Sequence, residues 1–304
     1  MPSPPRFVHH PDYHIELPVA HRFPMKKFRL LYELLLREGL ATPEDFVAPE
    51  LMPTIAQLEL VHDSLYVDRI LNGGLDAEAE RRIGLPWSPA LAQRTRVAVA
   101  GTLCTARLAL EYGLACNTAG GTHHAFPDYG SGFCLFNDLA VTARVLRAEN
   151  PGLRILIVDL DVHQGDGTAF IFRDEAEVFT FSMHCENNFP GTKQSGDRDV
   201  ALPAGTGDGR YLDILREELP GILRDFAPAL ILYDAGVDTH AEDPLGRLEM
   251  SDAGLAARDN FVLRLAREAN IPIACVIGGG YGADLEGLAA RHAILHRQAR
   301  NFFD

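Results

Sequence analysis

The stretch LIVDLDVHQGDGT, residues 156–168, begins as a buried strand and then becomes strongly polar. Its first three residues are apolar, and the positions that follow hold the carboxylates Asp159, Asp161 and Asp166, the imidazole His163 and two glycines. A protein core does not accept unpaired carboxylates, because removing a charge from water costs free energy. The pattern therefore predicts a strand whose carboxyl end leaves the core and opens into a functional site.

From about residue 153 the chain alternates short apolar strands with amphipathic helices. The strands are predicted at 154–160, 177–183, 229–235 and 271–279, and the helices at 209–226 and 251–270. In the first half, helices are predicted at 26–40 and 90–113, and a strand with its loop at 114–121. Strands rich in Ile, Leu and Val that alternate with helices indicate a parallel sheet covered on both faces. We expect one α/β domain over residues 1–304.

Four of these strand ends are followed by residues that can do chemistry. They are the pair His123 and His124, the pair Asp161 and His163, the acid Asp238, and the phenol Tyr281. In a parallel sheet, ligands bind at the carboxyl ends of the strands. We therefore expect all four groups to meet at one edge of the sheet.

Asp161, His163 and Asp238 are candidate metal ligands. Side chains alternate along extended backbone, so Asp161 and His163 face the same way. Asp238, from a neighbouring strand, completes a set of one imidazole and two carboxylates with open positions, which suits catalytic Zn²⁺ or Fe²⁺. A divalent cation also removes the repulsion between these carboxylates. The alternative is that the motif only caps helices and lines a loop.

Two histidines and a tyrosine are candidate catalytic groups. Glycines flank His123 and His124, so that backbone can pass close to a ligand. Backed by Asp159 and Asp166, the imidazoles would form pairs that act as general base and electrostatic partner. Tyr281 follows three glycines, and its hydroxyl can donate to a developing oxyanion. As a dinucleotide-binding loop, the same glycine run would need an acidic residue about 20 positions on, which is absent.

Several motifs in one order resemble the zinc-dependent histone deacetylase family. They are GGTHHA, GSGFCLFND, VDLDVHQGDGT, FPGT, YDAGVDTHAEDPLG and GGGY. The details look closest to the class IV and bacterial branch. This resemblance implies the arginase/deacetylase fold, a single-domain three-layer α/β/α arrangement with a central, mainly parallel eight-stranded sheet.

The resemblance also implies a role for each matching residue. Zinc is expected on Asp161, His163 and Asp238, with His124 oriented by Asp166 as principal base and acid, His123 backed by Asp159, and Tyr281 polarising the amide carbonyl. Phe133 and Phe189 are expected to wall a narrow tunnel for an acyl-lysine stem, with Gly132 and Gly280 beside the substrate. A structural potassium ion is expected on Asp159, Asp161, His163, Ser182 and Met183. For the acidic loop residue that grips the substrate backbone, the candidates are Asp63 and Asp68.

The expected function is removal of acetyl or longer acyl groups from the lysine side-chain amine by metal-activated water. Alternatives on the same fold are an acetylpolyamine deacetylase, a two-metal arginase-like ureohydrolase and a non-catalytic acyl-binding module. Gly165 stands where the ureohydrolase needs a bridging carboxylate, and the binding module is expected to have lost Tyr281 or a metal ligand. Nothing in the sequence marks Cys134 as an activated thiol nucleophile.

Charge and composition limit the partners. The net charge of −14 disfavours direct binding of nucleic acid, which needs a basic surface. Five scattered cysteines without a C-x-x-C pair indicate neither a disulfide framework nor a thiolate zinc site. No run of about 18 apolar residues and no signal peptide is present, so we expect a cytoplasmic protein without a membrane partner.

Overall fold

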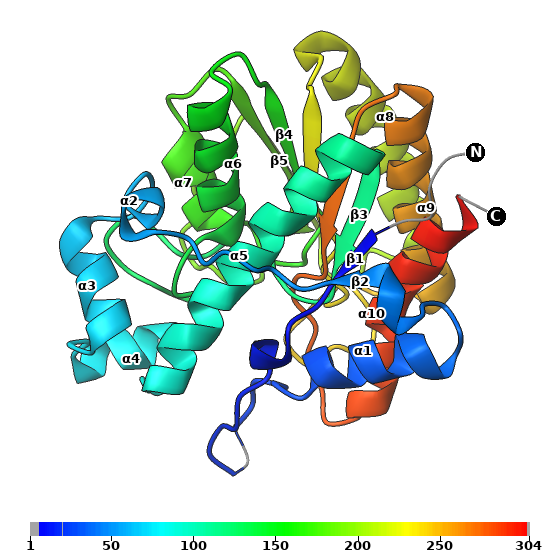
Figure 1. Cartoon of the computed structure of the whole chain (residues 1–304). Helices are drawn as coiled ribbons and strands as arrows, with labels where there is room; N and C mark the ends of the chain where they lie inside the picture. The colour runs from blue at the N-terminus through cyan, green and yellow to red at the C-terminus, as the bar shows by residue number, and fades with distance from the viewer. Residues whose placement is uncertain (1–5, 20, 303–304) are drawn as a thin grey trace.

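All the strands of the described residues lie in one sheet, and every neighbouring pair in it runs parallel (Figure 1). The computed structural model describes residues 6–19 and 21–302. The strands are β1 (Arg6–Val8), β2 (Phe46–Val47), β3 (Leu114–Asn117), β4 (Ile155–Asp159), β5 (Val178–Cys185), β6 (Arg198–Leu202), β7 (Leu230–Asp234) and β8 (Ile273–Val276). Their spatial order is β2-β1-β3-β8-β7-β4-β5-β6. The predicted parallel eight-stranded sheet is confirmed.

The central strands are those that the apolar pattern predicted. Strands β3, β4, β7 and β8 are buried along their whole length, as both faces of a parallel sheet covered by helices require. The sequence missed β1, β2 and β6. The first two have only three and two residues, and β6, at the edge of the sheet, is mostly exposed or half-buried. None of them therefore has an apolar run to recognise.

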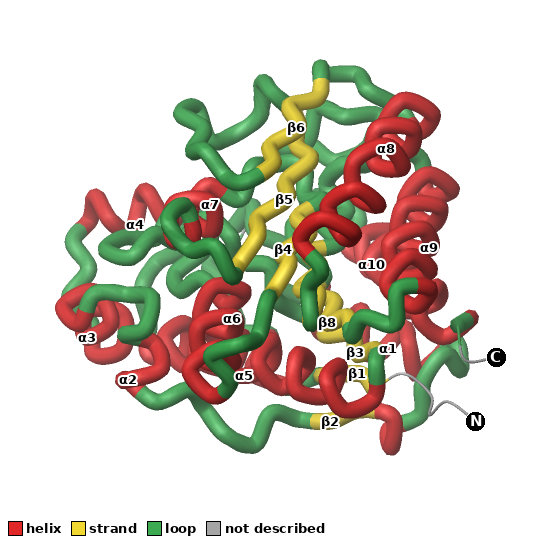
Figure 2. Tube along the Cα trace, turned by 90° about the horizontal axis from the view of Figure 1, so that it is seen from above, coloured by secondary structure: helices red, strands yellow, loops and turns green. Residues whose placement is uncertain are grey.

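Helices cover both faces of the sheet (Figure 2). They are α1 (Lys27–Arg37), α2 (Ile55–Leu58), α3 (Ser64–Asn72), α4 (Ala77–Ile83), α5 (Pro89–Tyr112), α6 (Asp138–Glu149), α7 (Asp166–Phe172), α8 (Asp208–Phe226), α9 (Asp252–Glu268) and α10 (Leu285–Asn301). Helix α5 packs on β1, β3 and β8 and contacts α6, whereas α8, α9 and α10 pack side by side on the other face. This is the three-layer α/β/α arrangement that was expected. Among the described residues, no helix combines the length and the apolar character needed to cross a membrane.

A buried arginine on α9 ties together the loops that follow β4 and β7. Arg258 is fully buried, and its guanidinium donates to the carbonyls of Leu160 at 3.2 Å, Gly236 at 2.7 Å and Ala235 at 3.3 Å. Its charge is balanced by Asp259, 2.9 Å away. Since carbonyls past strand ends have no ladder partner, this one side chain satisfies groups that would otherwise be buried and unpaired.

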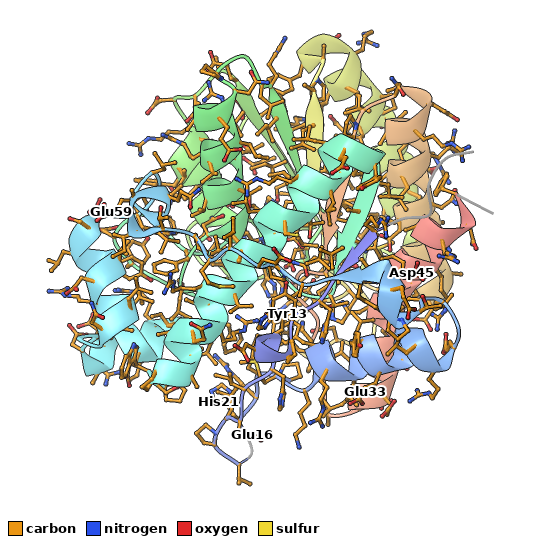
Figure 3. The ribbon with its side chains drawn as sticks, viewed as in Figure 1. Tyr13, Glu16, His21, Glu33, Asp45 and Glu59 are labelled. Atoms are coloured by element: carbon orange, nitrogen blue, oxygen red, sulfur yellow. The ribbon has the colours of Figure 1, made fainter. Side chains whose placement is uncertain are left out.

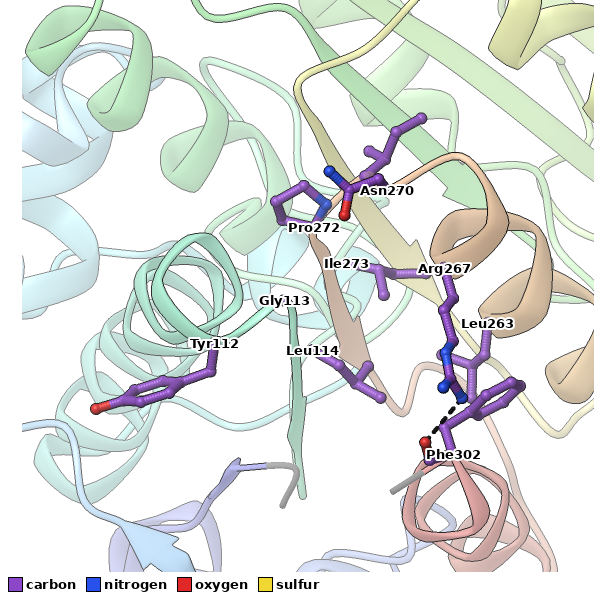
Figure 4. A pocket seen from close by; sticks show the side chains of 10 residues that line it. Tyr112, Gly113, Leu114, Leu263, Arg267, Asn270, Pro272, Ile273 and Phe302 are labelled. Carbon is purple, nitrogen blue, oxygen red and sulfur yellow. Dashed lines mark hydrogen bonds between the residues drawn. The ribbon is translucent and has the colours of Figure 1, made fainter. Parts of the chain in front are cut away.

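The opposite end of the sheet holds an apolar cavity of about 330 Å³ (Figure 4). Leu114 and Ile273, which begin β3 and β8, line it together with Leu263 and Phe302. Arg267 lies at this cavity and donates to the carbonyl of Phe302 at 2.8 Å. The cavity is therefore at the amino ends of the strands, away from the polar residues considered next.

We expect Arg258→Met to lower the free energy of unfolding by about 3–5 kcal/mol, because it leaves the buried Asp259 without its cation. Urea unfolding followed by circular dichroism measures this. Arg264→Met, on the same helix, removes an exposed pair with Glu268 and should change stability by about 0.5 kcal/mol or less. Equal losses in the two variants would show that Arg258 has no special role.

Candidate active site

The three candidate metal ligands meet at the carboxyl end of the sheet. Asp161 and His163 follow β4, and Asp238 follows β7, which pairs with β4. Their ligand atoms lie within 4.8 Å of one another, with His163 Nδ1 2.9 Å from Asp161 Oδ1 and 3.1 Å from Asp238 Oδ2. All three side chains are buried. The structure thus brings together one imidazole and two carboxylates from two loops.

The chemistry of this set fits a divalent cation. Burial and the charge of Asp161 raise the pKa of Asp238 to about 7. Burial opposes a charged His163, but its hydrogen bonds with the two carboxylates outweigh burial and raise its pKa to about 10. A proton on His163 therefore stands between the acids, and Asp238 Oδ2 is buried without a hydrogen bond of good geometry. A cation between the three side chains would replace that proton and bind Asp238 Oδ2.

Backbone amides hold the other carboxylate oxygens. Gly279 N–H donates to Asp161 Oδ2 at 2.7 Å, and Val162 N–H donates to Asp238 Oδ1 at 2.9 Å. These bonds leave one oxygen of each acid directed at the shared point. Such outer hydrogen bonds fix the orientation of metal ligands in proteins.

The two adjacent histidines each pair with a buried carboxylate. His123 Nδ1–H donates to Asp159 Oδ2 at 2.7 Å, and His124 Nδ1–H donates to Asp166 Oδ1 at 2.6 Å. The Nε2 atoms of the two rings are 3.1 Å apart. Asp159 ends β4 and Asp166 begins α7, so one strand-loop-helix unit supplies both carboxylates.

The surroundings separate the pKa values of these histidines. Burial and the neighbouring charge of His123 lower the pKa of His124 to about 4. Burial also opposes a charged His123, but the charges of Asp159 and Asp161 outweigh it and raise the pKa of His123 well above its ordinary value. His123 is therefore the more readily protonated ring of the pair, and His124 is the ring that stays neutral.

Tyr281 lies beside both the metal-ligand set and the tunnel described below. Its ring centre is 6.4 Å from that of His163 and 5.7 Å from that of Phe133, and its backbone N–H donates to Asp243 Oδ2 at 2.7 Å. Burial and the charges of Asp238 and Asp161 raise the pKa of the Tyr281 phenol above its usual range. The hydroxyl therefore remains a hydrogen-bond donor.

Lys27 is a residue of this region that sequence reasoning missed. It begins α1, is fully buried, and its Nζ donates to the carbonyls of Gly278 at 3.2 Å and Gly280 at 3.1 Å. Nζ also lies 5.6 Å from the centre of the Tyr281 ring. Two adjacent lysines in an amphipathic helix give no signal that one of them is buried, so this contact was not predictable.

Gly280 was expected beside the substrate, and the structure places it elsewhere. It is not among the residues that line the tunnel. A Cβ at this position would come within 2.6 Å of Val237 and 2.7 Å of His292, so close packing of the loop explains the glycine. Its part in the site is the carbonyl that Lys27 binds.

Asp234 is a second residue that sequence reasoning missed. It ends β7 directly beside Asp159, and both of its carboxylate oxygens are buried without a hydrogen bond among the described residues. Burial and the charge of Asp159 raise the pKa of Asp234 well above the ordinary value. Asp234 also clusters with His123 and Asp159, whose Nδ1 and Oδ2 atoms are 2.7 Å apart.

A tunnel of about 220 Å³ reaches the imidazoles from the surface. The residues that line it are Arg22, Arg82, Ile83, His124, Gly132, Phe133, His163, Phe189, Leu245 and Tyr281. Phe133, Phe189 and Gly132, which were expected beside the substrate, are among these lining residues. A Cβ on Gly132, which has φ +52°, would lie 2.5 Å from the His124 ring. Neither Asp63, which caps α3, nor Asp68 lines the tunnel.

The remaining predicted residues lie on neighbouring strands. Ser182 of β5 pairs in register with Asp159 of β4, and Met183 follows it, fully buried. These positions put the expected potassium residues next to the candidate catalytic site.

Burial raises the pKa of the Cys134 thiol to about 12, so this cysteine is not a thiolate nucleophile.

Comparison with known proteins gives consistent matches over nearly the whole chain. Residues 21–296 match the histone deacetylase domain. An uncharacterized protein of Picosynechococcus is 56% identical over 97% of this chain and 98% of its own length. Histone deacetylase 2 of Arabidopsis thaliana is 32% identical over 86% of this chain and 70% of its own length.

A solved structure agrees with these relatives. The HDAC homolog from Aquifex aeolicus superposes with a TM-score of 0.83 at 25% identity, covering 98% of this chain and 84% of that one. The predicted resemblance is therefore confirmed by domain, sequence and structure together. The chain belongs to the histone deacetylase family and is a hydrolase of the deacetylase class.

Proposed function

We propose that this deacetylase removes acetyl or longer acyl groups from the lysine side-chain amine, with one Zn²⁺ on Asp161, His163 and Asp238. The observation that supports this most is the placement of that ligand set and two imidazole–carboxylate pairs at the base of one narrow tunnel. The donor set also suits Fe²⁺. We further propose structural K⁺ on Asp159, Asp161, His163, Ser182 and Met183.

Each residue at the base of the tunnel has a separate role in the proposed amide hydrolysis. A bound divalent cation supplies positive charge that polarises the amide carbonyl and lowers the pKa of a water molecule. His124, which faces the tunnel and is neutral, accepts a proton from the attacking water, while Asp166 fixes its ring. Tyr281 donates its hydroxyl to the carbonyl oxygen as negative charge develops there. Protonated His123 lies behind His124, so the pair holds a proton for the leaving amine.

The tunnel favours a long, thin substrate. Phe133 is buried and Phe189 is 44% exposed, so one aromatic wall is deep and the other reaches the surface. The apolar methylene stem of an acylated lysine suits such walls, because contact with them removes its surface from water. The carbonyl at its end would then reach the level of His124 and Tyr281.

The structure disfavours two of the three other functions considered on this fold, the ureohydrolase and the non-catalytic binding module. A two-metal ureohydrolase needs a carboxylate at position 165, but a Cβ on Gly165 would lie 2.3 Å from Asp159 Oδ2, so no side chain fits. A binding module without activity is expected to lack a ligand or the phenol. Asp161, His163, Asp238 and Tyr281 are all in place.

We expect Tyr281→Phe to lower kcat on an acetyl-lysine peptide by about 100-fold or more, because it removes one hydrogen bond to the oxyanion. The zinc content of the variant, measured by elemental analysis, should equal that of the unmodified protein. Tyr112→Phe is the matched control, since Tyr112 is a half-buried tyrosine at the other end of the sheet. Full turnover by Tyr281→Phe would refute the role given to the phenol.

We expect the purified protein to bind about one zinc per chain, and Asp238→Asn to lose most of it and nearly all turnover. The metal-free variant should still fold, because the change removes a buried charge that Asp161 repels. Zinc content, turnover and a thermal melt on one sample test all three points. Two manganese ions per chain with urea release from guanidines would support the ureohydrolase instead.

We expect His124 to titrate at about pH 4 in the metal-free protein, with His123 still protonated above neutral pH. Nitrogen-15 NMR of labelled histidines measures both. Asp166→Asn should lower the His124 pKa further, because the carboxylate favours the protonated ring. Titration of both rings near 6.5 would contradict the division of roles between them.

A further inference from the structure

We propose that Arg22 and Arg82 make the mouth of the tunnel a binding site for a carboxylate that the substrate has near its acylated amine. This inference rests on the proposed function and adds a substrate class to it. An acyl-lysine with its own free carboxylate, or one beside Asp or Glu in a peptide, presents the same group. The two guanidinium groups lie together at the mouth, neither forms an ion pair with a carboxylate of the described residues, and the tunnel lining has positive charge.

Arg22 lies against the wall of the tunnel. Its guanidinium carbon is 5.0 Å from the centre of the Phe133 ring, and the residue is exposed. It belongs to the loop that also has Glu16 and His21, seen at the bottom of Figure 3. Glu16 pairs with His14 at 3.6 Å, and no carboxylate of the described residues lies within 4.0 Å of Arg22.

Arg82 reaches the same mouth from the last turn of α4. Its Nε donates to the carbonyl of Gly130 at 3.2 Å, and its guanidinium carbon is 4.6 Å from the centre of the Tyr129 ring. These contacts fix the side chain without using its two terminal nitrogens. In the described part of the chain, Arg82 forms no ion pair; Asp76, at the start of α4, is exposed and accepts from the backbone of Glu78 and Ala79.

The lining of the tunnel has the opposite charge from the chain as a whole. The chain has a net charge of −14, yet the tunnel is lined by two arginines and by no aspartate or glutamate. Lys193 adds a third cation nearby, where its Nζ donates to the carbonyls of Asn188 and Pro190 on either side of Phe189. A cationic acetylpolyamine would meet like charge here, whereas an anionic group would be attracted.

The residue type also favours a carboxylate. A guanidinium presents parallel N–H donors that match the two oxygens of a carboxylate, which a lysine ammonium does not. Because both arginines are at the mouth, they contact the backbone end of an acyl-lysine and not its amide. They should therefore select substrates by binding, without taking part in the reaction.

Matched substrates test this inference with the zinc-loaded full-length protein. One pair is Nα-blocked Nε-acetyl-lysine with a free carboxylate and the same compound as its carboxamide. The other arm is a set of acetyl-lysine peptides in which the flanking residues are Asp, Asn or Lys. N-acetylputrescine, assayed separately, is a further cationic substrate. We expect kcat/KM to be about 3- to 10-fold higher for each anionic substrate than for its neutral partner. The cationic substrates should have the lowest kcat/KM. The preference for the anionic substrates should decrease as the salt concentration rises.

Variants connect the preference to the two arginines. Arg22→Gln and Arg82→Gln should each reduce the preference for the anionic substrate, by raising KM for the anionic member more than for its neutral partner, and the double variant should abolish it. Arg22→Lys and Arg82→Lys keep the charge but lose the parallel N–H donors, so each should retain part of the preference, more than the corresponding glutamine variant and less than the unmodified protein. Arg81→Gln, exposed on α4 but not in the tunnel lining, is the matched control.

The outcomes separate this inference from the proposed function. If no acetyl-lysine substrate is hydrolysed, the proposed function fails. If all are hydrolysed at rates independent of their charge, or if the preference survives in the double variant, the inference fails while the proposed function stands.

Discussion

The compensation of buried negative charge is the constraint on which this site depends. Asp159, Asp161, Asp166, Asp234 and Asp238 are all buried at the carboxyl ends of β4 and β7 or just beyond them. Isolated carboxylates cannot remain ionised in such a place, because the loss of hydration far exceeds what a fold can supply. Each acid here is matched by an imidazole, by backbone amides, by its own proton or by the expected cation. The same neighbours that make burial tolerable also give the histidines different protonation states.

The fold supports this arrangement by holding the loops, and the loops hold the side chains. The parallel register of β4 and β7 sets Asp159 beside Asp234 and brings the two ligand loops together. Two buried cations then bind backbone carbonyls: Arg258 binds those after β4 and β7, and Lys27 binds those of the glycine loop before Tyr281. Since carbonyl contacts depend on backbone position, these side chains fix the path of the chain on both sides of the metal-ligand set.

The central strands and the polar residues that follow them could be predicted from the sequence, because both have a local pattern of residue types. An apolar run that ends in Asp or His, with alternation along the strand, is visible without any structure. Asp234 has the same pattern, as the end of the strand LILYD, but only the register shows that it lies against Asp159. Arg22, in a loop, and Arg82, in α4, are far apart in the sequence and meet only in the folded chain. Gly280 appeared to belong to the substrate site because its neighbour Tyr281 does, although packing against His292 explains it.

Depth in the tunnel separates the groups that act on the reaction from those that act on binding. In the function proposed above, the hydrogen-bonding groups of His124 and Tyr281 at the base face a carbonyl whose charge changes during hydrolysis, so their contacts would strengthen in the transition state and raise kcat. At the mouth, the charge on a substrate carboxylate is the same before and during the reaction, so contacts with Arg22 and Arg82 lower KM and leave kcat unchanged. The apolar walls between them, Phe133 and Phe189, keep the two levels apart. Substrate choice can therefore change at the rim of this fold without disturbing the charge balance on which the chemistry depends.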